Sequence, residues 1–138
     1  MAGPLIFRGP GIFTGVRATV LNYCIFHTTF ASCKHLNTMI LEVAILTVKE
    51  GQEKQFEADF AIAGEYISSI KGYIKHSLRK CLEQKNQYLL LVDWEKLEDH
   101  TIGFRQSSQY LEWKRLLHHY YDPFPTVEHY ETVIENIN

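Results

Sequence analysis

Residues 73–94, YIKHSLRKCLEQKNQYLLLVDW, contain two strand patterns of different kinds separated by a polar turn. Residues 73–82 alternate between apolar and polar side chains, which predicts a strand half exposed to water or half facing a polar cavity. Residues 87–94 are almost continuously apolar, as is typical of a central strand covered on both faces. Because residues 83–86 are all polar, the segment predicts a β-hairpin.

A strand and a helix precede this hairpin. Residues 40–48 are rich in Ile, Leu and Val and end at Lys49-Glu50-Gly51, which predicts a strand followed by a turn. Residues 52–70 carry apolar side chains at alternating spacings of four and three, which form one continuous stripe on a helix. The stripe consists of Phe56, Phe60, Ala63, Ile67 and Ile70. Lys71-Gly72 then ends the predicted helix.

A second helix and a fourth strand follow the hairpin. Residues 98–105 are weakly helical and are interrupted at Gly103, and Ser107 or Ser108 can cap a helix that ends at Asp122-Pro123. Residues 126–134 alternate and predict a final strand. The order β-α-β-β-α-β predicts an α+β fold of the ferredoxin-like class, a four-stranded antiparallel sheet with both helices on one face.

Both faces of the predicted sheet are apolar, although two helices can cover only one of them. Leu90 and Trp94 lie on one face of their strand, and Leu89 and Leu91 lie on the other. A homodimer that packs sheet against sheet would cover the second face. The same arrangement predicts an apolar cavity between sheet and helices for a small planar ligand. A charged residue, Glu42, on a mostly apolar strand face indicates an edge, an interface or a pocket.

Length and composition exclude several classes of protein. The chain has 138 residues, of which 46% are hydrophobic and 22% charged, so one folded domain is expected. No window holds 18 uninterrupted apolar residues, which excludes a membrane span, and the net charge of −2 argues against nucleic acid as a partner. The odd count of three cysteines predicts a reducing, cytoplasmic compartment. Motifs typical of nicotinamide, nucleotide and serine-hydrolase sites are absent.

Residues 1–38 differ in composition from residues 39–138. All 16 Asp and Glu residues lie at or after Glu42, whereas the basic residues Arg8, Arg17 and Lys34 lie before Met39. A signal sequence, an organellar transit peptide and an extra structural element are three interpretations. The favoured interpretation is an extension outside the folded core, with the domain at 39–138. A chain that begins at Met39 is therefore expected to fold and to dimerise.

Several motifs resemble the antibiotic biosynthesis monooxygenase domain. They are Trp94-Glu95, Glu98-Asp99-His100, the segments 103–107 (GFRQS) and 110–114 (YLEWK), and 125–130 (PTVEHY). The resemblance covers about residues 39–134. It implies a dimeric α+β barrel of ferredoxin-like protomers. It also implies an activity from a range that includes cofactor-free oxygenation of aromatic polyketides and quinols, as well as heme degradation.

Three positions separate this chain from branches of that family. The heme-degrading branch has an Asn and a heme-ligating His where this chain aligns Ala44 and Lys114, although Trp94 matches. Because a Lys does not replace the neutral imidazole that binds heme iron, heme is disfavoured and no cofactor is predicted. Molecular oxygen would then be the co-substrate. The polyketide oxygenases have an Asn where this chain has Leu90.

Cofactor-free oxygenation needs a base, hydrogen-bond donors for a phenolate oxygen and a dry aromatic pocket. We expect Trp94, His100 and Arg105 to be the catalytic residues. Each of the three has a structural alternative. Trp94 could be a core residue, His100 a surface or capping residue, and Arg105 a partner in a salt bridge. The residues expected to bind substrate are Leu90, Phe104, Tyr110, Trp113 and His118.

The remaining histidines carry weaker predictions. His118 and Asp122 are four residues apart on one helix and could reach one metal ion, but no third ligand is spaced to join them, so no metal is predicted. His76 and His129 are interpreted as polar residues of an interface. The leading hypothesis is a dimeric, cofactor-independent monooxygenase for an aromatic or quinol-like molecule. The alternative is a non-catalytic dimeric barrel that binds a small molecule or a protein partner.

Overall fold

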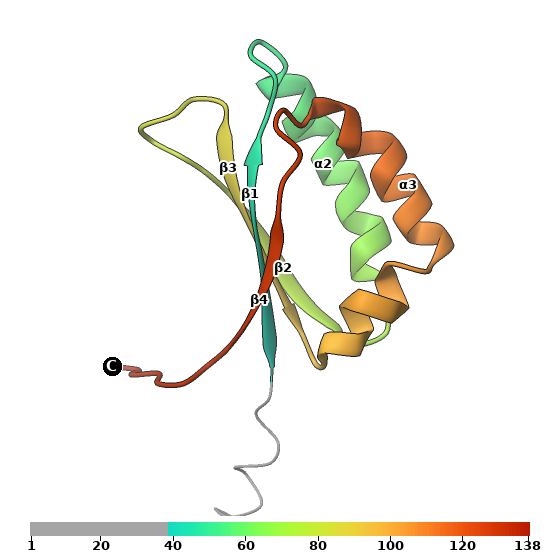
Figure 1. Ribbon diagram of the computed structural model, residues 1–138, viewed down its shortest axis with the longest axis vertical. Helices are drawn as coiled ribbons and strands as arrows, with labels where there is room; N and C mark the ends of the chain where they lie inside the picture. Colours follow the sequence, from blue (N-terminus) through green and yellow to red (C-terminus); the bar gives the residue numbers. More distant parts are fainter. Residues whose placement is uncertain (1–38) are drawn as a thin grey trace, which may run out of the picture. The chain divides into compact units, whose positions relative to one another are not determined.

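The computed structural model describes residues 39–138, so the interpretations of residues 1–38 lie outside the described residues. Strands and helices follow one another in the predicted order (Figure 1). The strands are β1 (Ile40–Thr47), β2 (Tyr73–Lys80), β3 (Gln87–Trp94) and β4 (Val127–Glu131). The helices are α2 (Glu53–Ser68) and α3 (Ser108–Leu117). A π-helical segment, Asp99–Phe104, precedes α3, and a 3₁₀ turn, His118–Tyr120, follows it.

The strands form one antiparallel sheet in the order β2-β3-β1-β4. The central position of β3 agrees with its continuously apolar sequence, and α2 and α3 cover one face of the sheet (Figure 1). The predicted ferredoxin-like α+β arrangement is therefore confirmed. The register matters for the site, because Glu42 of β1 lies opposite Val92 of β3 on one side and opposite His129 of β4 on the other.

Helix α2 packs on the sheet through the predicted stripe. Turns at two glycines with positive φ bound the segment that contains this helix, Gly51 at +82° and Gly72 at +85°. Such angles are accessible to glycine at little cost. The buried members of the stripe are Phe56, Phe60, Ala63 and Ile67.

Helix α3 begins where the sequence predicts and ends earlier. The hydroxyl of Ser107 accepts a hydrogen bond from the backbone N–H of Tyr110 at 3.1 Å, which makes Ser107 the N-cap. The helix ends at Leu117 rather than continuing to Asp122. In the segment that follows, the carbonyl of Tyr120 accepts from the N–H of Lys49 at 2.9 Å, and the N–H of Asp122 donates to Thr47 at 2.9 Å. These bonds hold the chain against the end of β1.

The start of β2 departs from the predicted alternation. A register irregularity between Tyr73 and Lys75 places Tyr73 on the helix side of the sheet, with its hydroxyl 2.6 Å from Nδ1 of His76. The alternation predicted for residues 73–82 would place Tyr73 and His76 on opposite faces, and it is wrong at this point because a β-bulge adds a residue to one strand. The edge strands are also shorter than predicted, since β2 ends at Lys80 and β4 ends at Glu131.

The sheet face opposite the helices is apolar and open. Leu89 and Leu91 are half-buried there, and Ile45 is 54% exposed. Two grooves on this face have volumes of about 360 and 450 Å³. Within residues 39–138, the helices therefore cover one side of the sheet and leave the other side uncovered.

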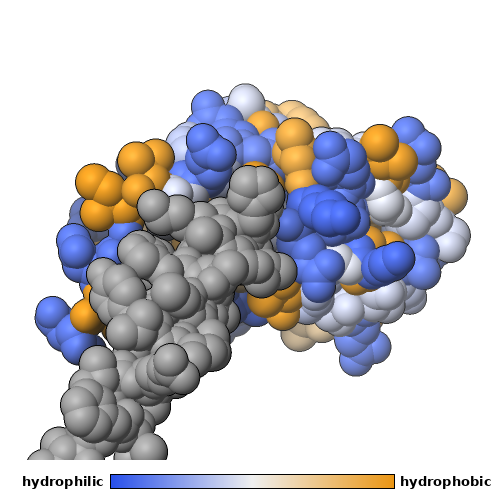
Figure 2. Space-filling view, turned by 90° about the horizontal axis from the view of Figure 1, so that it is seen from below, coloured by the Kyte–Doolittle hydropathy of each residue, from blue (hydrophilic) through white to orange (hydrophobic). Residues whose placement is uncertain are grey.

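Elsewhere on the described surface, Figure 2 shows one side of the molecule. Ile62 on α2 is 51% exposed, and hydrophobic and hydrophilic residues are interspersed on the side of the molecule that Figure 2 displays. Between residues 39 and 138, no helix combines the length and apolar character needed to cross a membrane.

Candidate functional site

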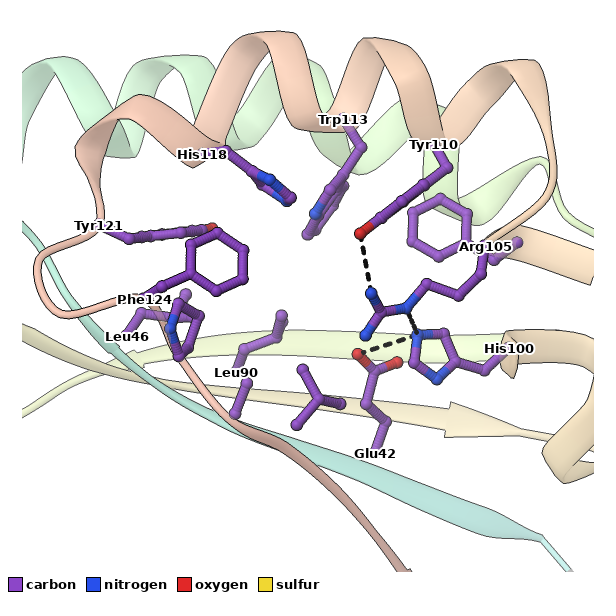
Figure 3. A pocket seen from close by; sticks show the side chains of 14 residues that line it. Glu42, Leu46, Leu90, His100, Arg105, Tyr110, Trp113, His118, Tyr121 and Phe124 are labelled. Carbon is purple, nitrogen blue, oxygen red and sulfur yellow. Dashed lines mark hydrogen bonds and ion pairs between the residues drawn. The ribbon is translucent and has the colours of Figure 1, made fainter. Parts of the chain in front are cut away.

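A small pocket lies between the sheet and the helices, with a polar end and an aromatic end (Figure 3). Its cavity of about 40 Å³ has room for a few water molecules. Strand residues form the floor, and residues of α3 and of the segments on either side of it form the roof. The lining residues are Glu42, Ala44, Leu46, Leu90, His100, Phe104, Arg105, Tyr110, Trp113, His118, Tyr121, Phe124, Pro125 and Val127.

Glu42 is the buried carboxyl group at the polar end. Its position on β1 directs it toward the helices, where it is only 4% exposed. The indole N–H of Trp94 donates to Oε2 of Glu42 at 2.8 Å. Burial raises the pKa of Glu42 to about 7, and the bond from Trp94 and the charge of Arg105 only partly oppose this. Glu42 therefore changes protonation state near neutral pH.

His100 comes from the π-helical segment and lies beside Glu42. Its ring stacks on Trp94 with centroids 5.4 Å apart, and its Nε2 lies 3.5 Å from Oε1 of Glu42. Burial, reinforced by the charge of Arg105 and the neighbouring His129, lowers the pKa of His100 to about 3. With the pKa of Glu42 raised and that of His100 lowered, the pair below pH 7 is a carboxylic acid beside a neutral imidazole, not an ion pair.

Arg105 and Tyr110 supply hydrogen-bond donors next to this pair. The Nε of Arg105 donates to Nε2 of His100 at 3.3 Å, and its Nη1 donates to the hydroxyl of Tyr110 at 2.8 Å (Figure 3). The guanidinium also lies 5.2 Å from the centre of the Tyr110 ring. A fixed positive charge and a phenol therefore face the polar end of the pocket, where a ligand oxygen that gains negative charge would be stabilised.

Aromatic rings form the other end. His118 and Phe124 meet edge to face with centroids 4.9 Å apart, and Tyr121 lies beside both. Burial is the largest cause of a lowered pKa of His118, so this ring is neutral at neutral pH. Phe124 is 62% exposed and stands at the mouth of the pocket. This end suits an apolar, planar ligand.

The structure brings most of the predicted site residues together. Of the expected catalytic residues, His100 and Arg105 line the pocket, whereas Trp94 is fully buried behind Glu42 and is not part of the lining. The pocket lining includes every residue expected to bind substrate, namely Leu90, Phe104, Tyr110, Trp113 and His118. Among residues 39–138, no group of three His, Cys, Asp or Glu side chains is arranged to hold a metal ion.

Two polar residues at the site were not among the predicted site residues. Glu42 carried a signal, since it is a charge on an apolar strand face, but that signal did not distinguish a pocket from an edge or an interface. His129 was interpreted as an interface residue, yet its Nε2 lies 2.7 Å from Nδ1 of His100. The pairing of β4 with β1 explains this contact, because it places His129 directly beside Glu42.

The wild-type protein is expected to lose stability relative to Glu42→Gln as the pH rises from about 4.5 to about 7. Because the pKa of Glu42 is raised, the folded state holds this proton more tightly than the unfolded chain does. The stabilisation is complete below the unfolded value of 4.5 and is lost above about 7. At about 1.4 kcal/mol for each pH unit, the loss is about 3 kcal/mol.

Urea unfolding of both proteins between about pH 4 and pH 8 measures this difference. Comparing the two proteins cancels the contributions of all other titrating groups. A stability difference that does not change with pH would contradict the raised pKa.

Comparisons with known proteins identify relatives of this fold. Residues 39–116 match the profile of the family described as Antibiotic biosynthesis monooxygenase. YczJ of Bacillus subtilis (strain 168), a protein of uncharacterised function, is 60% identical over 95 residues, which are 69% of this chain and the whole of YczJ.

Solved structures show the same fold. One is a Bordetella bronchiseptica protein classed with the antibiotic biosynthesis monooxygenases, with 34% identity and a TM-score of 0.68 over 71% of this chain and all of that chain. Another is SnoaB, a cofactor-independent oxygenase from Streptomyces nogalater, with 20% identity and a TM-score of 0.55 over 72% of this chain and 96% of that one.

Proposed function

Since the chain belongs to the antibiotic biosynthesis monooxygenase family, we propose that it is a cofactor-independent monooxygenase for an aromatic, phenolic or quinol-like small molecule. The observation that carries this proposal is the buried Glu42 carboxyl beside the guanidinium of Arg105 in a pocket otherwise lined mainly by aromatic and aliphatic side chains. A base whose pKa lies near the working pH, a fixed cation and a dry surrounding are what proton removal from a phenol requires.

The reaction begins with a proton transfer. The Glu42 carboxylate takes the proton of the substrate hydroxyl, while Arg105 and the Tyr110 hydroxyl stabilise the resulting oxyanion. Of the two buried ionisable groups, Glu42 is the better base, because His100 has a lowered pKa and its Nε2 already accepts a bond from Arg105. His100 instead positions the carboxyl group.

Oxygen then reacts with the electron-rich ring. The anion transfers one electron to O₂, and the two radicals combine to give a peroxide at a ring carbon, which takes up a proton from the Glu42 carboxylic acid. Loss of water leaves a carbonyl at that carbon. One oxygen atom of O₂ ends in the carbonyl and the other in water, and the substrate carbon supplies all the electrons, so no external reductant is needed.

Oxygen uptake with anthrone-like phenols and hydroquinones tests the proposal directly. The expected result is uptake above the background rate, with one atom of labelled oxygen gas in the product carbonyl. Absence of uptake on every substrate of these classes would overturn the enzymatic proposal. It would favour a barrel that only binds a small molecule.

One observation favours that second function. The family branches with assigned chemistry that this chain resembles have an Asn where it has Leu90 or a heme-ligating His where it has Lys114, and here Leu90 contributes an apolar wall. Isothermal titration with a hydroquinone under nitrogen separates the two functions. Binding without oxygen uptake supports the non-catalytic function, and binding with uptake supports the enzyme.

Phe124→Ala is expected to speed the entry of an aromatic ligand several-fold. The cavity of about 40 Å³ is far below the size of typical ligand pockets, so a ring enters only when its mouth opens. Because Phe124 is largely exposed, its removal should change the stability by less than about 0.5 kcal/mol. Stopped-flow fluorescence of ligand binding measures the rate, with Leu111→Ala on the outside of α3 as control. Equal association rates in the two variants would contradict a gate at Phe124.

We further propose that two protomers pack through the open sheet faces. Ile45→Lys is expected to shift the protein from dimer to monomer at micromolar concentration, because a charge would enter the apolar centre of that contact. Ile62→Lys is the matched control, since its side chain is equally exposed but lies on α2. Sedimentation velocity measures the mass. A monomeric wild type would contradict the dimer.

A further inference from the structure

Two imidazole rings follow Glu42 in a row that starts at the polar end of the pocket and ends on the edge strand β4. Nε2 of His100 lies 3.5 Å from Oε1 of Glu42, and Nδ1 of His100 lies 2.7 Å from Nε2 of His129. Glu42 and His129 are cross-strand partners on β1 and β4, and His100 reaches them from the π-helical segment above. Three groups that can exchange protons therefore form a continuous row.

The hydrogen bonds define where the protons are. A guanidinium is always a donor, so the bond from Arg105 requires a lone pair on Nε2 of His100. The proton of the neutral His100 ring then lies on Nδ1 and is donated to Nε2 of His129. His129 in turn carries its own proton on Nδ1. Both rings thus have the orientation that a stepwise proton transfer needs.

The row is exposed only at its far end. His100 is 2% exposed and Glu42 is 4% exposed, whereas His129 is half-buried on the edge strand β4. A ligand in the pocket would cover the side of Glu42 that faces the cavity. The indole N–H of Trp94 bonds to the other carboxyl oxygen, and because an indole is only a donor it cannot take a proton from Glu42. The row through His100 then offers a route by which a proton on Glu42 can reach the surface.

We propose that His100 and His129 relay protons between Glu42 and solvent while a ligand occupies the pocket, an inference that rests on the proposed function. The O–H bond of Glu42 breaks as its proton moves to Nε2 of His100. The proton on Nδ1 of His100 moves to Nε2 of His129, and the proton on Nδ1 of His129 moves to water. In total, one proton leaves Glu42 for water, and both rings change tautomer. The reverse transfers return a proton from water to Glu42 and restore both tautomers when the peroxide is protonated.

Arg105 couples the relay to ligand binding. Its Nε and Oε1 of Glu42 compete for the same lone pair on Nε2 of His100. Nε of Arg105 lies 3.3 Å from that nitrogen, and Oε1 of Glu42 lies 3.5 Å from it. When the guanidinium turns to a substrate oxyanion, that lone pair is free to accept from Glu42. Glu42 from β1 and Arg105 after the π-helical segment are the charged and titratable groups that face the two rings.

Burial, together with the charge of Arg105, lowers the pKa of both His100 and His129, so both rings are neutral.

His129→Gln tests the relay, because a Gln amide accepts the bond from His100 but does not pass a proton on. The matched control is His76→Gln, which removes another half-buried strand histidine that is bonded to Tyr73 and lies outside the pocket. In weak buffer, kcat of His129→Gln should fall at least ~10-fold with KM unchanged, and added imidazole should restore it. His76→Gln should behave as wild type. An unchanged kcat, or a loss that imidazole does not restore, would overturn the relay.

A measurement without substrate distinguishes failure of the relay from failure of the proposed function. Nitrogen-15 NMR of the full chain reports the tautomer of each ring and the rate at which the Nδ1 proton of His100 exchanges with water. The relay predicts the Nδ1–H tautomer in both rings and slower exchange in His129→Gln than in wild type and His76→Gln. The opposite tautomers, or equal exchange rates, overturn the relay even if the protein is an oxygenase.

Discussion

Glu42→Gln is expected to lower kcat by about 10²- to 10⁴-fold, the usual contribution of a positioned general base. Gln has the same shape as Glu, and its carbonyl can still accept the indole N–H of Trp94. The amide can compete with Arg105 for the lone pair on Nε2 of His100, as the carboxyl group does, so the hydrogen-bonding pattern of the buried site stays close to that of the wild type. The loss of activity would therefore report the loss of the base and not of the fold.

Two further variants make this result specific. Glu65→Gln, on the exposed surface of α2, should leave kcat unchanged. His100→Gln should reduce kcat less than Glu42→Gln does, because on our proposal His100 positions the carboxyl group and is not the base. Oxygen uptake at saturating substrate is the measurement. Wild-type activity in Glu42→Gln would contradict the assignment of the base.

Gly72→Ala is expected to destabilise the protein by about 2–5 kcal/mol. An alanine at a φ of +85° costs about 1–2 kcal/mol by itself. In addition, its Cβ would lie 2.8 Å from Cβ of Asp99 and would overlap the Asp99 carboxylate. Asp99 cannot turn away freely, because Oδ2 accepts the backbone N–H of Lys96 at 3.1 Å.

Gly51→Ala is the matched control for this prediction. Gly51 has nearly the same φ, +82°, but a Cβ there meets no atom within 4 Å. Thermal or urea unfolding of the two variants therefore separates backbone strain from the clash with Asp99. If Gly51→Ala and Gly72→Ala lost the same stability, the contact with Asp99 would contribute nothing. Because Asp99 begins the segment that carries His100, Gly72→Ala should also reduce activity.

The sequence predicts the fold well because the spacing of apolar residues and the residues that begin or end an element are local signals. The apolar stripe of α2, the polar turn between β2 and β3 and the serine cap of α3 each define an element by nearby residues. The bulge at Tyr73 and the early end of α3 depend instead on contacts with β3 and β1, which lie far away in the sequence. Such features cannot be read from one segment.

The site was only partly predictable for the same reason. His100 and Arg105 could be named from motifs close together in the chain. The role of His129 depends on the pairing of β4 with β1, which joins residues 87 positions apart. Glu42 stood out in the sequence, but its proximity to Arg105 and Trp94 emerges only when the sheet and the π-helical segment are in place.

The π-helical segment has an evolutionary consequence. The backbone N–H of Arg105 donates to the carbonyl of His100 at 3.0 Å, five residues earlier, so one residue more than an α-helical turn separates the two side chains. Deleting one codon between them would restore an α-helical turn and rotate Arg105 by about 100° relative to His100. The number of residues between the His and the Arg can therefore be used to compare related sequences. Relatives with one residue fewer there would lack the guanidinium beside the carboxyl group.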